Sequence, residues 1–278
     1  MKYEVFTNSL KIKFIVSKPI LKKTALTLIT ILFLPLMIKW RKKNILWLFL
    51  AIGMITSSGR ASAQANQPGA GNCLQFNGVN NIIQVADANN LSFTNTLTIE
   101  AWINTAQNGI AKRIIGKELI GSIWPEYFVL MNNDGTIQFG INTFNGDNIS
   151  RLNTVASYND NLWHHVAATY DGATMRIFID GIPDGTLATT KILWNSSSQL
   201  SIGSANGGVN ATYTWDGQLD EVRIWNRALT QTEIRNNMCQ KLIGNEPGLV
   251  GYWRFDETAG NIYFDSQTNV APNNGTGF

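Results

Sequence analysis

The sequence predicts an all-β protein, folded as a two-sheet antiparallel sandwich. Much of the chain after residue 73 alternates apolar and polar side chains with a period of two, as half-buried strands do. In residues 97–104, for example, Leu, Ile, Ala and Ile alternate with Thr, Glu, Trp and Asn. The strand candidates are short and separated by Gly, Asn and Asp, which favours a sandwich over alternating strands and helices.

Turn residues place two hairpins and two further strands. Asn133-Asp134-Gly135 and Asp171-Gly172 each separate two strand-like runs, and Asp180-Gly181 predicts a third turn. Asx-Gly pairs suit tight hairpins because both residues tolerate positive φ. The corresponding predicted strands are residues 127–131, 136–141, 165–170, 175–180, 200–203 and 218–225.

One short helix is predicted near residues 230–238. Thr230 and Glu233 have the spacing of a capping box, in which each side chain bonds the other residue's backbone N–H. The apolar residues that follow are few, so the helix has about two turns.

Charge divides the chain into two unlike parts. Residues 1–63 carry eleven Lys or Arg and one acid, whereas residues 64–278 carry eleven Lys or Arg and eighteen acids, a net charge of −7. The folded part therefore lacks the cationic footprint of a nucleic-acid-binding protein. We expect no nucleic-acid partner.

Residues 1–63 are predicted to be an export signal. A basic cluster at 39–43 precedes the apolar run Ile45–Ile55, and Ala61-Ser62-Ala63 completes the pattern of a secretory signal peptide. The apolar run has eleven residues, fewer than the roughly 20 that span a bilayer. Cleavage after Ala63 would leave residues 64–72 as a small-residue linker.

Residues 1–36 allow two interpretations. Translation starting at Met37 would give a signal of ordinary length. Alternatively, the apolar run Thr24–Ile38 and the later one form a two-segment anchor with a basic cytoplasmic turn. Either way the rest is expected to be secreted or displayed at the cell surface, and to meet a membrane only through this signal or anchor.

Four motifs in a fixed order carry a family resemblance. Together they resemble the laminin-G-like jelly-roll domain of the concanavalin A-like lectin/glucanase superfamily, over roughly residues 73–240. The resemblance implies a jelly-roll of two antiparallel sheets, one concave, with the N- and C-terminal strands as neighbours. The motifs are LQFNGVNN at 74–81, LTIEAWI at 97–103, WHHVAATYDG at 163–172 and DGQLDEVRIWNRALT at 216–230.

This resemblance also suggests domain boundaries. The jelly-roll is expected to occupy residues 73–244. In such families a run like residues 248–257 commonly opens the next repeat, so residues 245–278 would begin a second domain of a longer surface protein. Alternatively, Leu249–Phe255 packs back onto the same sandwich as an extra edge strand.

Cys73 and Cys239 bracket the expected domain and are the only cysteines. An even count in an exported protein favours a disulfide, and neighbouring terminal strands make the geometry reasonable. Closing so long a loop would stabilise the domain by about 2–5 kcal/mol. The alternative is two buried free thiols.

A structural calcium ion is a further expectation from the resemblance. In several related families an Asp on the last strand helps to hold Ca²⁺, and Asp220 is the matching residue. Backbone carbonyls from Asn77 to Asn80 would complete the oxygen ligands that Ca²⁺ requires. Asp87 and Asp216 are weaker candidates, and a salt bridge or turn bond for Asp220 is the alternative.

Catalysis is not expected. His164 and His165 are adjacent on a predicted strand and therefore point to opposite faces, so they cannot chelate one ion. A glycosidase would need two carboxylates facing each other across a cleft, about 5–10 Å apart. Asp220 and Glu221 are adjacent and diverge, and Glu100 has no acidic partner two positions away.

Aromatic residues are the best candidates for a ligand site. Trp102, Trp163 and Trp225 lie in predicted strands and are expected in the core. The loop residues Trp124, Trp194, Trp215 and Tyr213 offer flat apolar faces on which sugar rings stack, unless they only cap the core.

Three functions remain open at this level. The first is an exported, non-catalytic binding or adhesion module for a carbohydrate or a glycosylated surface partner. The second is a structural spacer repeat of a larger surface protein. A laminarinase-like glycoside hydrolase is the third, because the same sandwich hosts all three.

Overall fold

The computed structural model describes residues 2–7, 10–15, 71–118, 125–143, 148–205 and 213–278. The chain divides into two compact units, residues 1–62 and 63–278. Most of the expected export signal and the linker lie outside the described residues. No helix within the described ranges is long and apolar enough to cross a membrane.

In the first unit the structure describes one hairpin. Strand β1 (Lys2–Thr7) pairs antiparallel with β2 (Leu10–Ile15), and Lys2 lies opposite Ile15. The sequence analysis did not foresee these strands, because it treated the segment only as part of a leader.

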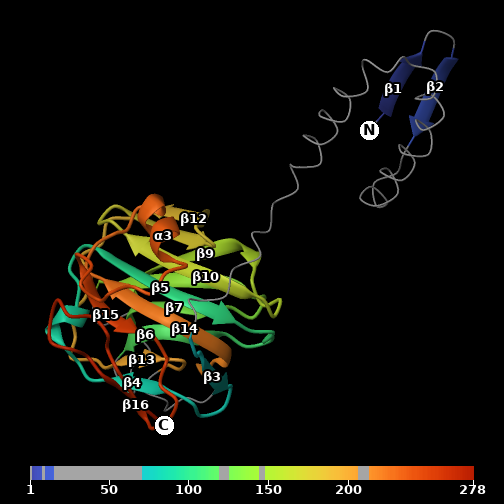
Figure 1. Cartoon of the computed structure of the whole chain (residues 1–278). Coiled ribbons are helices and arrows are strands. Elements are labelled where there is room, and N and C mark those ends of the chain that lie inside the picture. The colour runs from blue at the N-terminus through green and yellow to red at the C-terminus, as the bar shows by residue number, and fades with distance from the viewer. Residues whose placement is uncertain (1, 8–9, 16–70, 119–124, 144–147, 206–212) are drawn as a thin grey trace, which may run out of the picture. The chain divides into compact units, whose positions relative to one another are not determined.

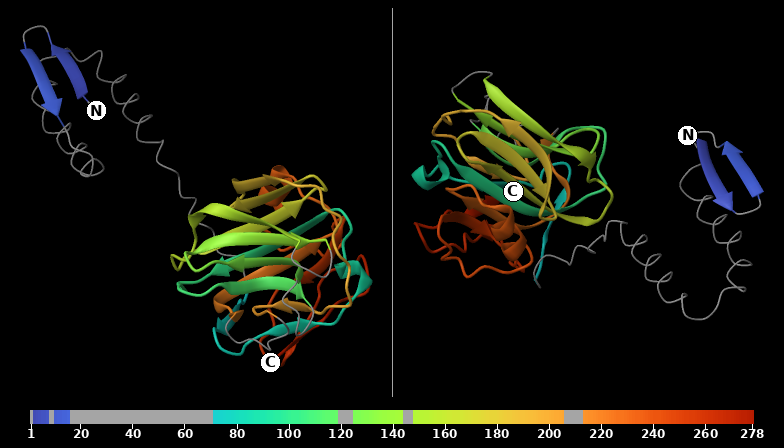
Figure 2. Two further views of the ribbon diagram at one scale, coloured as in Figure 1. Left: turned by 180° about the vertical axis from the view of Figure 1, so that it is seen from behind. Right: turned by 90° about the horizontal axis from the view of Figure 1, so that it is seen from above.

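The second unit is the expected all-β sandwich of two antiparallel sheets (Figures 1 and 2). In the first sheet, of seven strands, β14 pairs with β5 along one edge and with both β3 and β15 along the other. The sheet comprises β12 (Ile182–Ala188), β11 (Thr174–Ile179), β10 (Trp163–Tyr170), β5 (Leu97–Asn104), β14 (Asp216–Trp225) and β15 (Leu249–Trp253), in this order, with β3 (Leu74–Asn77) beside β14.

The second sheet has eight strands. Its order is β16 (Ile262–Tyr263), β17 (Gly275–Gly277), β4 (Ile83–Val85), β13 (Leu200–Ile202), β6 (Lys112–Glu118), β7 (Pro125–Met131), β8 (Thr136–Asn142) and β9 (Ile149–Ser157). A short 3-10 helix, η1 (Asn89–Leu91), follows β4.

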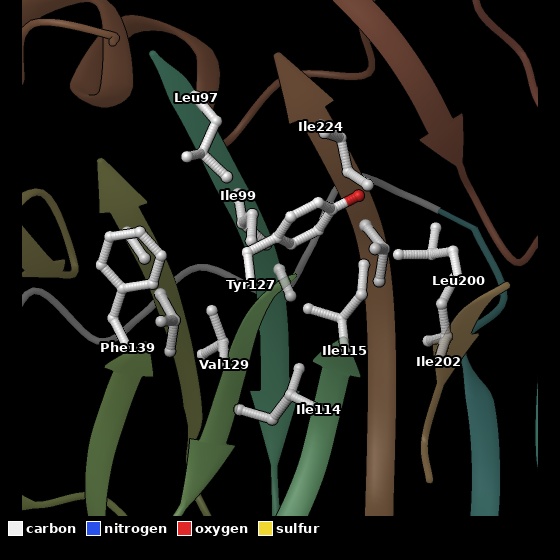
Figure 3. Close-up of a cluster of buried hydrophobic side chains, with 14 of the residues drawn as sticks. Leu97, Ile99, Ile114, Ile115, Tyr127, Val129, Phe139, Leu200, Ile202 and Ile224 are labelled. Atoms are coloured by element: carbon white, nitrogen blue, oxygen red, sulfur yellow. The ribbon is translucent and has the colours of Figure 1, made fainter. Parts of the chain in front are cut away.

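Strand alternation fills the space between the sheets with one hydrophobic core. On β5 the odd-numbered residues, such as Ile99, point into it, and so does Val129 on β7. Figure 3 shows these side chains meeting from both sheets, with the Tyr127 ring among them. The Tyr127 hydroxyl donates a 2.8 Å hydrogen bond to the carbonyl of Leu91, which satisfies its one polar atom inside the core.

The predicted turns are confirmed. Strands β7 and β8 form one hairpin, and β10 and β11 form the next. At the turn from β11 to β12, Asp180 and Gly181 have φ values of 54° and 71°. Two successive positive φ values twist the chain in the sense that a tight hairpin requires, which explains the Asp-Gly pair.

The predicted helix is α3 (Gln231–Asn237), and its capping box is present. Thr230 accepts a hydrogen bond from the backbone N–H of Glu233, and Glu233 accepts one from that of Thr230. The helix buries Ile234 in a second, smaller cluster with Trp225 and Leu242. This cluster covers part of the outer face of the seven-stranded sheet, the face turned away from the main core.

The tail after residue 244 belongs to the same sandwich. Strand β15 continues the edge of β14 beyond β3, and β17 pairs with β4 of the other sheet. Trp253 and Phe255 are buried in the main core. Of the two expectations for residues 245–278, the structure contains the extra strand, and the expected boundary at residue 244 is too early.

Candidate functional site

Three amide side chains lie side by side on the outer face of the seven-stranded sheet. Gln218 of β14 is opposite Gln75 of β3 on one side and opposite Asn104 of β5 on the other. Their strand neighbours Leu219 and Ile103 point into the main core, so alternation directs all three amides outward. We call Gln75, Gln218 and Asn104 the amide row.

The amide row lines a polar pocket with a volume of about 400 Å³, which we call the amide pocket. An amide group has both a C=O acceptor and an N–H₂ donor, so it can match a hydroxyl group without carrying charge. Asp216 is the only ionisable side chain in the lining. The complete lining is Gln75, Asn104, Thr105, Ala106, Gln107, Asn161, Asp216, Gly217 and Gln218.

A glycine and a threonine fix the floor of the pocket. Gly217 has φ 142°, and a Cβ there would lie 2.2 Å from the carbonyl oxygen of Asn104. Only glycine therefore lets β14 begin this close to β5. The Thr105 hydroxyl then donates a 2.5 Å hydrogen bond to the carbonyl of Asp216, which joins the loop after β5 to the start of β14.

Gln107 supplies an unused donor at the pocket wall. Its Oε1 accepts a 2.9 Å hydrogen bond from the backbone N–H of Asp216. Its Nε2 is buried and has no hydrogen-bond partner among the described residues. A buried N–H without a partner is costly, and a ligand hydroxyl in this pocket is one group that can satisfy it.

Trp163 lies next to the amide row, contrary to expectation. It is opposite Asn104 in the β10–β5 register, and its side chain is half-buried rather than part of the core. Val166 and Ala168 of β10 point into the core, so alternation places Trp163 on the same outer face as the amides. The sequence analysis missed this because an alternating strand does not reveal which face stays uncovered.

The predicted loop aromatics do not gather at this pocket. Trp124 lies outside the described residues. Trp194 is half-buried and Tyr213 is 38% exposed, and neither lines the amide pocket. The expectation of an exposed Trp215 is wrong, because its ring is completely buried in the main core, directly before β14.

The expected calcium ligands are separated by strand register. Asn77 is opposite Asp216, not Asp220. Asp220 is four residues further along β14, about 13 Å at 3.3 Å per residue, so it cannot share an ion with carbonyls at 77–80. The Asn77 amide oxygen instead accepts hydrogen bonds from the N–H groups of Val79, Asn80 and Asn81, and its Nδ2 donates one to Asn80.

Carboxylates elsewhere do not replace that set. Asp87 forms an ion pair with Lys117, whose Nζ is 2.9 Å from its Oδ1. Within the described ranges, no group of three or more His, Cys, Asp or Glu side chains is placed to hold a metal ion. Asp220 is buried, and burial together with the Glu221 carboxylate raises its pKa to about 8.

The two cysteines are free thiols in the structure, so the expected disulfide is not formed. Cys73 precedes β3 and is half-buried, where burial and the nearby Asp220 raise its pKa. Cys239 follows α3 and is exposed, near Asp180 and Arg223.

The two histidines point to opposite faces, as expected, but neither is a free surface residue. His164 lies between Asp180 and Asp160, at 2.9 and 3.1 Å. Burial alone would lower its pKa, but hydrogen bonds to the two aspartates outweigh burial and raise it. His165 is buried on the outer face of the sheet, where burial and the positive charge of Arg223 lower its pKa to about 3.

Comparison with known proteins places this geometry in a family. Residues 77–235, more than half of the chain, match the sequence profile of the concanavalin A-like lectin/glucanases superfamily, in its laminin-G-like branch. Mouse pappalysin-1 is 27% identical over 108 residues, which cover 38% of this chain and 7% of pappalysin-1. The chain thus corresponds to a small part of that relative.

Solved structures agree on the fold. A candidate carbohydrate-binding protein from Bacteroides ovatus superposes with a TM-score of 0.59 at 22% identity, over 74% of this chain and 57% of that one. Domains LG4-5 of the mouse laminin α1 chain superpose with a TM-score of 0.46 at 15% identity, over 60% and 46% of the two chains. From the extent of the profile match, supported by this shared fold, we conclude that the chain belongs to the concanavalin A-like lectin/glucanase superfamily as a laminin-G-like member.

Proposed function

We propose that the chain is an exported, non-catalytic binding module that holds a glycan in the amide pocket. The observation that carries the proposal is the amide row, in which Gln75, Gln218 and Asn104 of three neighbouring strands line one polar pocket. Sugars present many hydroxyl groups, and each of them both donates and accepts hydrogen bonds. Uncharged amides on rigid strands match that chemistry at fixed spacing.

Three further features support a glycan. The half-buried Trp163 ring on the same face offers an apolar surface for the C–H face of a sugar. Gln107 contributes its unused Nε2. The similar fold of the Bacteroides ovatus protein, a candidate carbohydrate binder, fits the same class of ligand.

The pocket does not favour hydrolysis. Glycosidases of this type use two carboxyl groups about 5–10 Å apart. Asp216 is the only carboxylate among the residues that line the amide pocket. We therefore propose binding without bond cleavage, with a glycan or a cell-surface glycoprotein as the partner.

The experiment is a glycan array probed with the full chain, followed by titration calorimetry on the best ligand. Asn104→Ala and Gln218→Ala each remove one hydrogen-bonding group, worth about 0.5–1.5 kcal/mol, so each should weaken binding roughly three- to tenfold. Gln240→Ala is the matched control, because Gln240 is an exposed amide after α3 that does not line the pocket. A chain that binds no glycan, or equal affinity in all three variants, would contradict the proposal and favour a structural spacer.

A further inference from the structure

A second pocket lies on the other side of β3, where this strand meets the tail of the domain. It has a volume of about 230 Å³, and we call it the tail pocket. Its lining includes Gln75, Asn81, Asn261, Tyr263 and Phe278. Strand β17 brings this part of the tail beside β4, since the backbones of Phe278 and Ile82 exchange hydrogen bonds of 3.0 and 3.4 Å.

The two pockets share one residue, Gln75, which lines both. Gln75 is exposed, and it is the outermost member of the amide row because β3 has no other described strand partner than β14. Its Nε2 donates a 2.9 Å hydrogen bond to the carbonyl of Phe76, which holds the amide against its own strand. A ligand that passes over Gln75 therefore reaches from one pocket into the other.

The tail pocket adds aromatic rings to the polar surface of the amide pocket. The Tyr263 ring packs edge-to-face on Phe255 with centroids 5.7 Å apart, and a Cβ on Gly277 would lie 2.6 Å from it. Gly277 thus leaves room for a ring that the core holds in place. The Phe278 side chain is 66% exposed, so its ring is accessible from solvent.

Charge narrows the ligand further. No Lys, Arg or His lines either pocket, and Asp216 is the only acidic side chain. A sugar acid would meet no cation to pair with its carboxylate and would be repelled by Asp216. The combined lining of amides, two aromatic rings and one acid suits an uncharged sugar.

We propose that the ligand is a neutral oligosaccharide that lies across Gln75, with one part in the amide pocket and the next part against Tyr263 and Phe278. This inference rests on the proposed function and extends it from a sugar to a chain of sugars. Either pocket alone is small compared with the roughly 300–1,000 Å³ of a typical ligand site, which is consistent with two subsites used together.

The test compares chain lengths. The full chain is titrated with neutral gluco-, xylo-, manno- and arabino-oligosaccharides from one to six units, and with a uronic acid series of the same lengths. We expect affinity for one neutral series to rise at least tenfold from the monosaccharide to the tri- or tetrasaccharide. Phe278→Ala should remove about three- to tenfold of that gain, the usual worth of one aromatic contact, and leave monosaccharide binding unchanged.

Phe264→Ala is the matched control, because Phe264 is also an exposed aromatic of the tail, at 57%, but lines neither pocket. A neutral sugar bound with the same affinity at every length, or equal effects of Phe278→Ala and Phe264→Ala, would overturn the two-subsite inference while the proposed function stands. Preference for the uronic acid series would overturn the neutral ligand. Failure to bind any glycan at all would reject the proposed function itself.

Discussion

The indole Nε1 of Trp225 donates a 2.7 Å hydrogen bond to Oε2 of Glu100, and both side chains are completely buried. Glu100 projects from β5 to the outer face of the sheet, beneath the cluster that includes α3. Burial raises the pKa of Glu100, and Arg223 and the Trp225 bond only partly oppose that shift. The second oxygen, Oε1, lies 3.6 Å from His165 Nε2. The layer under α3 therefore contains polar groups that depend on one another.

Glu100→Ala should destabilise the domain strongly. The change leaves the Trp225 N–H buried without an acceptor and opens a cavity, which together cost about 2–4 kcal/mol. Glu100→Gln is the control, because its amide oxygen can still accept from the indole while the buried carboxyl group is removed. Urea unfolding measures both variants. Equal losses in the two variants would show that the hydrogen bond to Trp225 is not the reason for the effect.

Asp220 should make the domain less stable as the pH rises toward 8. Its pKa is about 8 in the folded chain, compared with 3.8 for an ordinary aspartate. Between these values the folded state holds a proton that the unfolded state has released, so the free energy of unfolding falls with rising pH. His165, with a pKa of about 3, acts in the opposite direction below its unfolded value of 6.5.

The window from pH 6.5 to 8 therefore isolates Asp220 from His165. We expect the unfolding free energy of the wild type to decrease across it, and Asp220→Asn, which cannot ionise, to remove most of that slope. Denaturant titrations at closely spaced pH values give the measurement. An unchanged slope in Asp220→Asn would assign the pH dependence to another group.

Gly203→Ala should cost more than an ordinary glycine replacement. Gly203 has φ 79°, and a Cβ there would lie 2.0 Å from the buried Phe76 ring. Gly109 has a similar φ of 83° but no atom within 4 Å of its Cβ position, so Gly109→Ala isolates the backbone strain. We expect about 1 kcal/mol for Gly109→Ala and about 2–3 kcal/mol more for Gly203→Ala. Thermal melts of comparable midpoint would refute the steric argument.

Removal of the chain after residue 244 should prevent stable folding. The truncation deletes Trp253 and Phe255 from the main core and leaves the edge of β14 unpaired where β15 lies. Loss of one such ring costs about 3–5 kcal/mol, a large part of the stability of a domain. Circular dichroism and binding of a hydrophobic dye distinguish the outcomes. A truncated chain that melts cooperatively near the wild-type temperature would restore the earlier boundary.

Chelation should leave the melting temperature unchanged, because strand register separates Asp220 from Asn77. The measurement is a thermal melt with EDTA and with added Ca²⁺. Saturation at 100 times the dissociation constant would stabilise the domain by about 2.7 kcal/mol. A rise of that size would revive the calcium expectation and require other ligands than those named from the sequence.

Local patterns predicted the elements of the fold well. The hairpin turns and the capping box of Thr230 and Glu233 depend on residues close in sequence, and the structure contains them. The superfamily was also evident, because four motifs in order specify the strands that carry them. What these patterns lack is the identity of the partner across each strand.

The site could not be predicted for that reason. Gln218 meets Gln75 and Asn104 only through pairing between strands far apart in sequence. Trp215 reads as a loop residue in sequence, yet the chain enters β14 through the core and buries its ring. Trp163 shows the opposite case, since burial depends on what covers a face.

The sharing of one edge of β14 between β3 and β15 has a consequence for how the chain acquires its fold. These strands stand near the beginning and the end of the domain, and both must reach β14 before that edge is paired. A ribosome delivers residue 253 long after residue 74, so the nascent polypeptide cannot close the sheet while it is being made. Contacts between such distant segments slow folding, because the loop entropy is lost before they form. We expect the domain to fold late and as one unit, after synthesis of its last strands.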